Sequence, residues 1–183
     1  IGGQTCTDIN IGVDGTVNLT LGTVDVGGSR ASMSMIAAEE LGIPYEQVKA
    51  NIADTGSLGH NDMTEGSRGT FSSGMATIFA AREAIGVLKQ RAAAMWGIPV
   101  EDVAWEKGQA IAIGKTHNNL PPLSLQEIAS KSGRTGGPIA GHNEVVADGA
   151  GMGFAAHICD VEVDKETGRS SIVRYTVVQD AGT

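Results

Sequence analysis

The chain has 183 residues, a formal net charge of −8 and only 13 lysines and arginines. This charge excludes a general electrostatic affinity for nucleic acid or for an anionic membrane, so an anionic ligand would have to be held locally. The length suits one domain with a substantial core, and we interpret residues 1–183 as a single domain cut from something larger. Glycine is unusually frequent, with 26 residues, which favours tight turns and close backbone approaches.

The two cysteines, Cys6 and Cys159, provide no disulfide framework and indicate a reducing compartment. We therefore expect a cytoplasmic protein, or a periplasmic one if the full-length protein carries an export signal. No apolar run approaches the roughly 18 residues that a membrane-spanning helix needs, so membrane insertion is not expected.

Alternating polar and apolar residues predict two antiparallel strands at the start of the chain, Gln4–Val13 and Thr16–Val26, with a turn signal at Asp14-Gly15. A third strand is predicted at Val48–Ala53. Two helices follow from apolar residues at helical spacing. The first is expected to be N-capped by Ser29, and the second carries apolar positions over residues 71–95.

The segment from Asp54 to Gly74 joins two strongly patterned regions and is rich in glycine, serine and threonine. A connection of this length without its own secondary structure tends to be functional or disordered. Because it leads into the second helix, it is expected to gather N–H groups and hydroxyls at a helix N-terminus, an arrangement that favours an anion such as phosphate.

The two helices are predicted to end alike, at Gly42-Ile43-Pro44 and at Gly97-Ile98-Pro99. An internal duplication of residues 16–54 and 55–113 is one explanation. The other is that Gly-Ile-Pro is simply a good helix terminator.

The second half of the chain predicts a hairpin over Val103–Ile113 turning at Lys107-Gly108, a short helix over Leu123–Ser130, and a final pair of strands. In the short helix, Ser124 and Glu127 have the spacing of a capping box. The final strands are Phe154–Asp164 and Ser171–Gln179, while Ile139–Asp148 alternates only near its end. Together the elements predict an α+β fold, a two-layer sandwich in which a mixed sheet carries two main amphipathic helices.

Three familiar motifs are rejected. Gly108 and Gly114-Lys115-Thr116 have the wrong spacing for a P-loop and no following helix. The glycine run at 149–153 leads into a strand, whereas a dinucleotide-binding turn must open into a helix. A nucleophile elbow is absent because Glu65 stands where the first glycine should precede Ser67.

A metal site is also weighed. His157 and Cys159 would share one face of a strand and could form a soft metal site with Cys6 or His60, but the spacing supplies no further ligand. Half-buried side chains are therefore the better interpretation. Two further histidines lie in expected polar loops and receive no role: His117 and His142.

Two loops of similar chemistry each lead into a helix, Val26–Arg30 and Thr64–Thr70. They could face one ligand with several anionic or hydrogen-bonding groups, and Arg30 and Arg68 in otherwise acidic surroundings favour an anion. The alternative is that both loops are only helix caps and turn residues.

At these loops the sequence resembles the molybdopterin-binding subunit of the xanthine dehydrogenase, aldehyde oxidase and carbon monoxide dehydrogenase family. The resemblance runs through nearly the whole chain and rests on the order and spacing of short segments. These segments are Thr23–Ser29, Ala37–Pro44, Asp54-Thr55, Thr64–Thr70, Val161–Gly168 and Asp180–Gly182.

The resemblance implies part of the catalytic subunit of a molybdenum hydroxylase that acts on a heteroaromatic or aldehyde carbon. It implies a molybdopterin cofactor, often the cytosine dinucleotide form in bacteria, whose molybdenum is ligated by the cofactor itself. Iron–sulfur and flavin (FAD) groups are expected on partner subunits or domains, together with the remainder of the molybdopterin subunit.

By resemblance, the loop at Gly27–Ser29 is expected to touch the pterin, and Gly28 stands where many relatives have a glutamine that bonds the cofactor. The second loop is expected to pass the pterin and the metal, with the backbone at Gly66 closest. The expected cofactor-binding residues are Gly27, Gly28, Ser29, Thr64, Glu65, Gly66, Ser67, Arg68 and Thr70.

The family's catalytic glutamate lies beyond the strand that ends near Asp180, so the fragment alone is expected to be inactive. The alternative is a non-catalytic binding or interaction module that uses the same fold without molybdenum. The absent glutamine and glutamate favour that alternative slightly.

Overall fold

The computed structural model describes residues 3–54, 56–114, 119–149 and 153–180. The chain divides into two compact units, residues 1–150 and residues 151–183, and each is described by itself. Lys115 and Thr116 of the rejected P-loop motif lie outside the described residues, and so do His117 and Thr55 of the Asp54-Thr55 segment that carries part of the family resemblance.

The first unit is built on a four-stranded mixed sheet in the order β3-β2-β1-β7. Its strands are β1 (Gln4–Ile11), β2 (Val17–Leu21), β3 (Val48–Ile52) and β7 (Ile139–Val146). Strand β1 pairs antiparallel with both β2 and β7, whereas β2 and β3 are parallel. The turn between β1 and β2 forms at the predicted position, with Gly15 at a φ of 84°.

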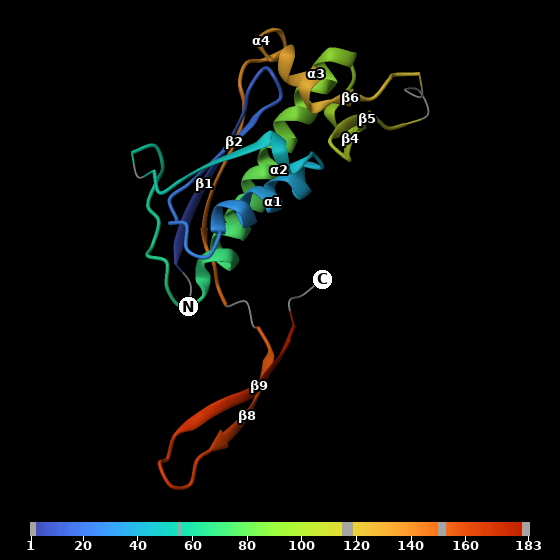
Figure 1. The fold of residues 1–183 in the computed structure, drawn as a ribbon. Coiled ribbons are helices and arrows are strands. Elements are labelled where there is room, and N and C mark those ends of the chain that lie inside the picture. The colour runs from blue at the N-terminus through green and yellow to red at the C-terminus, as the bar shows by residue number, and fades with distance from the viewer. Residues whose placement is uncertain (1–2, 55, 115–118, 150–152, 181–183) are drawn as a thin grey trace. The chain divides into compact units, whose positions relative to one another are not determined.

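Helices α1 (Ser29–Leu41) and α2 (Arg68–Trp96) cover one face of this sheet (Figure 1). Buried small residues recur along α2, and a Cβ at Gly141 of β7 would overlap the carbonyl oxygen of Ala80 in this helix. The helix and strand can therefore approach closely only because position 141 is a glycine. Leucine, isoleucine, valine and methionine side chains fill the space between the layers, among them Ile9, Leu19, Met33 and Leu88.

The two helices end alike, as predicted. Gly42 and Gly97 both adopt left-handed conformations, and the next residues, Ile43 and Ile98, donate backbone hydrogen bonds back to Ala38 and Ala93. Each ending is followed by a short 3₁₀ helix, η1 (Tyr45–Gln47) and η2 (Val100–Asp102). The shared geometry agrees with both a duplication and a common helix terminator.

At the far end of α2 lies a smaller sheet in the order β4-β5-β6, with two short helices beside it. The predicted hairpin forms, and so does the predicted capping box, in which Ser124 and Glu127 bond reciprocally. The elements are β4 (Val103–Glu106), β5 (Gln109–Ala112), β6 (Leu123–Ser124), α3 (Leu125–Ser130) and α4 (Ser132–Thr135).

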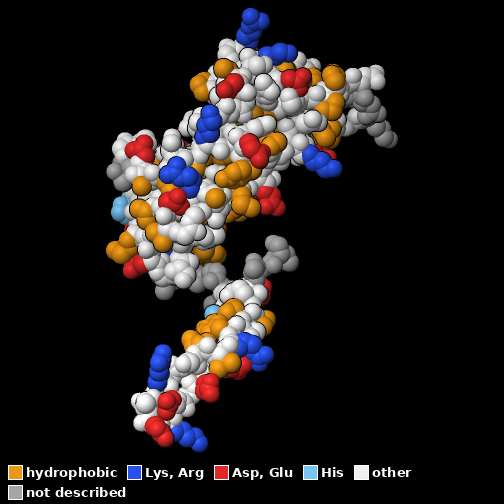
Figure 2. All heavy atoms as spheres, viewed as in Figure 1, with side chains coloured by type: hydrophobic (Ala, Val, Ile, Leu, Met, Phe, Trp, Pro, Cys, Tyr) orange, Lys and Arg blue, Asp and Glu red, His pale blue; other side chains and the backbone are white. Residues whose placement is uncertain are grey.

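The second unit is an antiparallel hairpin of β8 (Ala155–Val163) and β9 (Ser170–Gln179), with a bulge between Asp160 and Val161. Asp164 closes the turn by accepting the backbone N–H groups of Glu166 and Thr167. Figure 2 shows hydrophobic side chains along the surface of this hairpin. Its large exposed apolar residues are Phe154, Ile158, Val161, Val163, Ile172, Val173, Tyr175, Val177 and Val178.

The α+β class, the mixed sheet and the two main helices are confirmed. Three local predictions were wrong in detail. The second strand ends at Leu21 rather than Val26, because residues 22–28 form the turn that enters α1. Helix α2 already begins at Arg68, which shortens the long connection, and Ile139–Val146 is a full strand. Among the described helices, none combines the length and apolar character needed to cross a membrane.

Candidate functional site

Both main helices are entered through two consecutive left-handed residues. Gly27 and Gly28 precede α1 with φ angles of 69° and 85°, and Gly66 and Ser67 precede α2 with φ angles of 56° and 59°. Glycine adopts this conformation freely, but a residue with a Cβ pays roughly 1–2 kcal/mol for it. Ser67 therefore holds a strained conformation, a feature that is common where a ligand is bound.

The two turns border one cleft of about 300 Å³, which we call the two-turn cleft. The two walls are linked directly, since the hydroxyls of Thr23 and Thr64 lie 3.1 Å apart and share a hydrogen bond. Small and hydroxyl side chains dominate the lining. The lining residues are Thr23, Val24, Val26, Gly27, Ser29, Ser32, Thr64, Ser67, Gly69 and Thr70.

Five of the nine sequence-predicted site residues therefore meet in one place: Gly27, Ser29, Thr64, Ser67 and Thr70. The other four do not line the cleft, although Gly28 and Gly66 shape its turns. The predicted site list omitted the other five lining residues, which are Thr23, Val24, Val26, Ser32 and Gly69. Thr23 was hidden in an alternating run that looked like strand, whereas Ser32 could have been found because it follows Ser29 by nearly one helical turn.

The N-terminus of α1 is capped from within the chain. The predicted N-cap, Ser29, is instead the first helical residue, and Gly28 occupies the cap position. The carboxylate of Asp25 accepts the backbone N–H of Arg30 at 3.1 Å and lies 3.6 Å from its guanidinium. The Arg30 N–H bond lowers the pKa of Asp25 most, followed by the Ser29 hydroxyl. The carboxylate of Asp25 therefore already bonds a backbone N–H group in the first turn of α1.

The Ser29 hydroxyl is also engaged inside its own loop, 2.9 Å from the carbonyl oxygen of Val24 and 3.2 Å from Asp25. In contrast, the first turn of α2 has no side-chain cap, because Ser67 makes no such bond. The N–H groups that can serve a ligand in the two-turn cleft therefore come from the first turn of α2, with the hydroxyl of Thr70 beside them.

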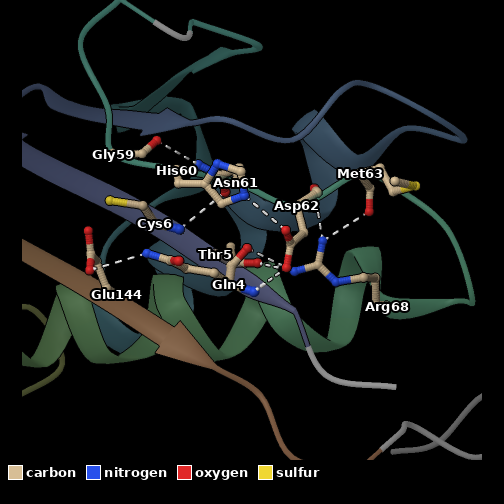
Figure 3. Close-up of polar contacts among 10 residues, drawn as sticks. All are labelled: Gln4, Thr5, Cys6, Gly59, His60, Asn61, Asp62, Met63, Arg68 and Glu144. Atoms are coloured by element: carbon tan, nitrogen blue, oxygen red, sulfur yellow. Dashed lines mark hydrogen bonds and ion pairs between the residues drawn. The ribbon is translucent and has the colours of Figure 1, made fainter.

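Arg68 does not provide the exposed cation that its acidic surroundings suggested. Its side chain is buried and donates to the carbonyl oxygens of Gln4, Asp62 and Met63 and to the hydroxyl of Thr5 (Figure 3). These bonds join the start of α2 to β1 and to the connection between β3 and α2. The guanidinium is thus a structural brace for one wall of the two-turn cleft.

The same connection continues the sheet beyond the end of β2. Strand β2 reaches only as far as Thr7 of β1, and the segment around Asn61 and Asp62 takes its place. Asp62 exchanges hydrogen bonds with the backbone of Gln4, and the Asn61 side chain accepts the backbone N–H of Cys6 at 3.1 Å. The long connection is therefore anchored along β1 before it enters α2.

The model of one protein family, described as the molybdopterin cofactor-binding domain, matches residues 2–183. The chain belongs to this family. It is 25% identical over 179 residues to the carbon monoxide dehydrogenase large chain of Hydrogenophaga pseudoflava. It is 27% identical over 184 residues to that of Afipia carboxidovorans. Each alignment covers 96% of this chain but only 22% of the relative, so the chain spans about a fifth of the length of these curated relatives.

Solved structures agree with the family assignment. A Cu,Mo-CO dehydrogenase in its carbon monoxide reduced state matches with a TM-score of 0.85 and 25% identity, over 98% of this chain and 23% of that chain. Quinoline 2-oxidoreductase from Pseudomonas putida 86 matches with a TM-score of 0.83 and 19% identity, over 99% of this chain and 24% of that chain. The second likeness supports the fold alone.

The residues of the two-turn cleft fit part of a molybdopterin. Molybdopterin offers the nitrogens, amino group and carbonyl oxygen of its pterin ring and a terminal phosphate, and this cleft presents hydroxyls, backbone groups and a helix N-terminus. A Cβ at Gly27 or Gly28 would meet no atom within 4 Å, so the first turn leaves open space beside the lining. A cleft of about 300 Å³ is at the small end of ligand sites, so it would hold one end of a larger cofactor.

Proposed function

We propose that the two-turn cleft holds the pterin end of a molybdopterin cofactor within a larger molybdenum-dependent oxidoreductase. The observation that carries this proposal is the convergence of two left-handed turns on one cleft in a chain of the molybdopterin cofactor-binding family. The first turn of α2 contributes backbone N–H groups. Ser67 and Thr70 contribute hydroxyls that can donate to or accept from the pterin.

The remaining residues of the site position these groups. The Thr23–Thr64 hydrogen bond fixes the distance between the two turns, and Arg68 holds the start of α2 against β1. Gly27 and Gly66 allow the backbone to approach the ligand closely. The bound cofactor would supply the redox chemistry at a metal ligated by its own sulfur atoms, so no protein side chain of this chain has to ligate molybdenum.

The finer parts of the proposal concern the whole protein. We propose the cytosine dinucleotide form of the cofactor, and iron–sulfur and FAD groups on partner subunits or domains that carry electrons away. The reaction would be the hydroxylation of a heteroaromatic or aldehyde carbon in the cytoplasm, with the catalytic glutamate outside these 183 residues.

Two glycines of α2 provide a matched test. Gly69 lines the two-turn cleft and has space for a Cβ, whose nearest neighbour would be Thr64 at 3.7 Å, while a Cβ at Gly86 would meet no atom within 4 Å. Gly69→Val should therefore fill the cleft, whereas Gly86→Val carries the same helix-propensity cost without doing so. Both variants would be made in the whole subunit that contains this chain.

The measurement is molybdenum per subunit by elemental analysis, together with cytidylate released by acid. We expect about one of each in the wild type and in Gly86→Val, and at least a tenfold loss in Gly69→Val. Equal loading of the two variants would place the cofactor elsewhere. A wild-type subunit with neither molybdenum nor nucleotide would favour the second candidate, a binding module without molybdenum, which the glycine at position 28 and the internal use of Ser29 support.

A further inference from the structure

A second group of reactive side chains lies on the opposite face of the main sheet from the helices. Strands β1 and β7 pair so that Cys6 is opposite Glu144 and Asp8 is opposite His142. Residues two apart on a strand share a face, so these four side chains form a square. Neighbouring Gly141 faces α2, which confirms that His142 points away from the helices.

The donor atoms of three of these side chains converge. One atom each from Cys6, His142 and Glu144 lies within 4.8 Å of the others, and the Cys6 sulfur is 3.8 Å from His142 Nε2. Figure 3 shows Cys6 and Glu144 projecting from neighbouring strands beside Gly59. Among the described residues, these three form the group of histidine, cysteine and carboxylate donors that could hold a metal ion. The group includes neither His157 nor Cys159.

The surroundings of the cluster fix the orientation of its members. Asp8 makes a short hydrogen bond with Nδ1 of His142, so Nε2 is the ring nitrogen left for a metal ion, and the Cys6 sulfur lies 3.8 Å from Nε2 and 3.9 Å from Nδ1. A carboxylate on the far nitrogen is the usual support of a metal-binding histidine. The Gly59 backbone N–H bonds the sulfur of Cys6, and a Cβ at Gly59 would lie 2.8 Å from Glu144 and 3.4 Å from that sulfur. The loop backbone thus closes over both donors.

The electrostatics of the cluster favour a cation. The carboxylate of Asp8 bonds Nδ1 of His142, Glu144 belongs to the cluster, and Glu83 accepts the backbone N–H of His142 at 3.1 Å. The carboxylate of Glu144 accepts a hydrogen bond from the neutral side-chain amide of Gln4, at 3.5 Å. Three carboxylates therefore surround a single histidine, and a divalent ion would offset their repulsion.

We propose that Cys6, His142 and Glu144 bind one thiophilic divalent ion such as Zn²⁺, with Asp8 orienting the histidine. In a tetrahedral zinc site, bonds of about 2.3 Å to sulfur and about 2.0 Å to nitrogen place these two atoms about 3.5 Å apart. The observed 3.8 Å requires a shift of only a few tenths of an ångström. The sulfur and nitrogen donors exclude Mg²⁺ and Ca²⁺, which prefer oxygen. The fourth position would hold water or another ligand.

The test is metal binding to the metal-free chain, independently of molybdopterin. Titration with Co²⁺ should give a thiolate-to-metal absorption band, and titration with Zn²⁺ should saturate at one ion per chain. Cys6→Ser should abolish the band, whereas Cys159→Ser, which removes the other cysteine, should keep it. A band that survives Cys6→Ser, or that is lost in Cys159→Ser, would overturn the assignment, and so would the absence of any binding.

Variants at positions less buried than Cys6 separate ligation from folding. Glu144→Gln and His142→Ala should each weaken Zn²⁺ binding at least tenfold, and Asp8→Asn should weaken it about 10- to 100-fold. His60→Ala removes a nearby exposed histidine, bonded to Asp62 at 2.9 Å, and should leave the affinity unchanged. The melting temperature of each metal-free variant checks its fold. Unchanged affinity in Glu144→Gln and His142→Ala would refute the site.

Discussion

The two units of the molecule differ in where their stability comes from. In residues 1–150, side chains from four strands and two long helices form one buried core. In the described part of the second unit, Asp160 alone is half-buried and every other residue is exposed, although its strands are patterned for burial and pair over nine positions. Cross-strand pairing therefore defines the hairpin, whose own residues enclose no buried core.

This difference has a physical consequence. An isolated two-stranded hairpin is marginally stable in water, because its pairs cannot offset the entropy of ordering the chain. The exposed apolar side chains of β8 and β9 are of the kind that mark surfaces covered by other protein. The first unit should unfold cooperatively, while the hairpin contributes little to that transition. Both tryptophans, Trp96 and Trp105, lie in the first unit, so their fluorescence reports on it alone.

The largest expected contrast comes from the same substitution in the two units. Gly141→Ala places a methyl group against the Ala80 carbonyl, where strand and helix backbones touch, and should lower the free energy of unfolding by about 3 kcal/mol, the upper end of the usual cost of overpacking. Gly168→Ala, in the hairpin turn at a φ of 72° with no atom near its Cβ, should leave that transition unchanged. Urea unfolding followed by tryptophan fluorescence measures both. Equal losses would mean that the units are coupled.

A smaller contrast is expected from two arginines. Arg68→Met removes the four hydrogen bonds of a buried guanidinium and should cost about 2 kcal/mol, since its acceptors become unsatisfied. Arg174→Met breaks an exposed 2.8 Å ion pair with Asp160 in the hairpin and should cost the first unit nothing. The same fluorescence measurement applies. An Arg68→Met variant as stable as the wild type would show that Arg68 does not hold the wall of the two-turn cleft in place.

Local features of the fold were predictable from the sequence because their causes are local. The left-handed glycines at 42 and 97, the turn at Gly15 and the capping box of Ser124 and Glu127 depend on residues a few positions apart. The pairing of β1 with β7 was not predictable, because it joins Gln4 to Val146 and no local period encodes it. The exact start of α2 was missed for a related reason, since its left-handed entry at Ser67 contradicts local preference.

The contrast between local and long-range causes also explains which parts of the two candidate sites were predictable. The two-turn cleft could be anticipated because each turn has its own glycine signal beside a helix. The inward direction of Arg68 could not, because its acceptors on β1 are more than 60 positions away. The cluster of Cys6 and His142 was also missed. If residues 139–146 had been taken as a strand, its alternation would have placed Ile139 and Gly141 on one face and His142 on the other.

The smallest expected effect on stability concerns two exposed aspartates, Asp25 and Asp164, whose carboxylates both accept backbone N–H groups. Backbone N–H bonds lower the pKa of Asp25, from Arg30 first, and the pKa of Asp164, from Glu166 first. A carboxyl group whose folded-state pKa is depressed stabilises the fold above its ordinary pKa of about 3.9, and this stabilisation is lost as the pH falls through the lowered value.

Only Asp25 belongs to the unit with a core, where it caps α1 beside the two-turn cleft. Asp25→Asn should therefore slightly lower the stability of the first unit at neutral pH and flatten its decline below about pH 4, because the titrating group is gone. Asp164→Asn should leave the tryptophan-detected transition unchanged at every pH, since the hairpin lies outside that cooperative unit. Fluorescence-detected unfolding at several pH values compares them, and a matching pH dependence in both variants would show that the turn of the hairpin supports the core after all.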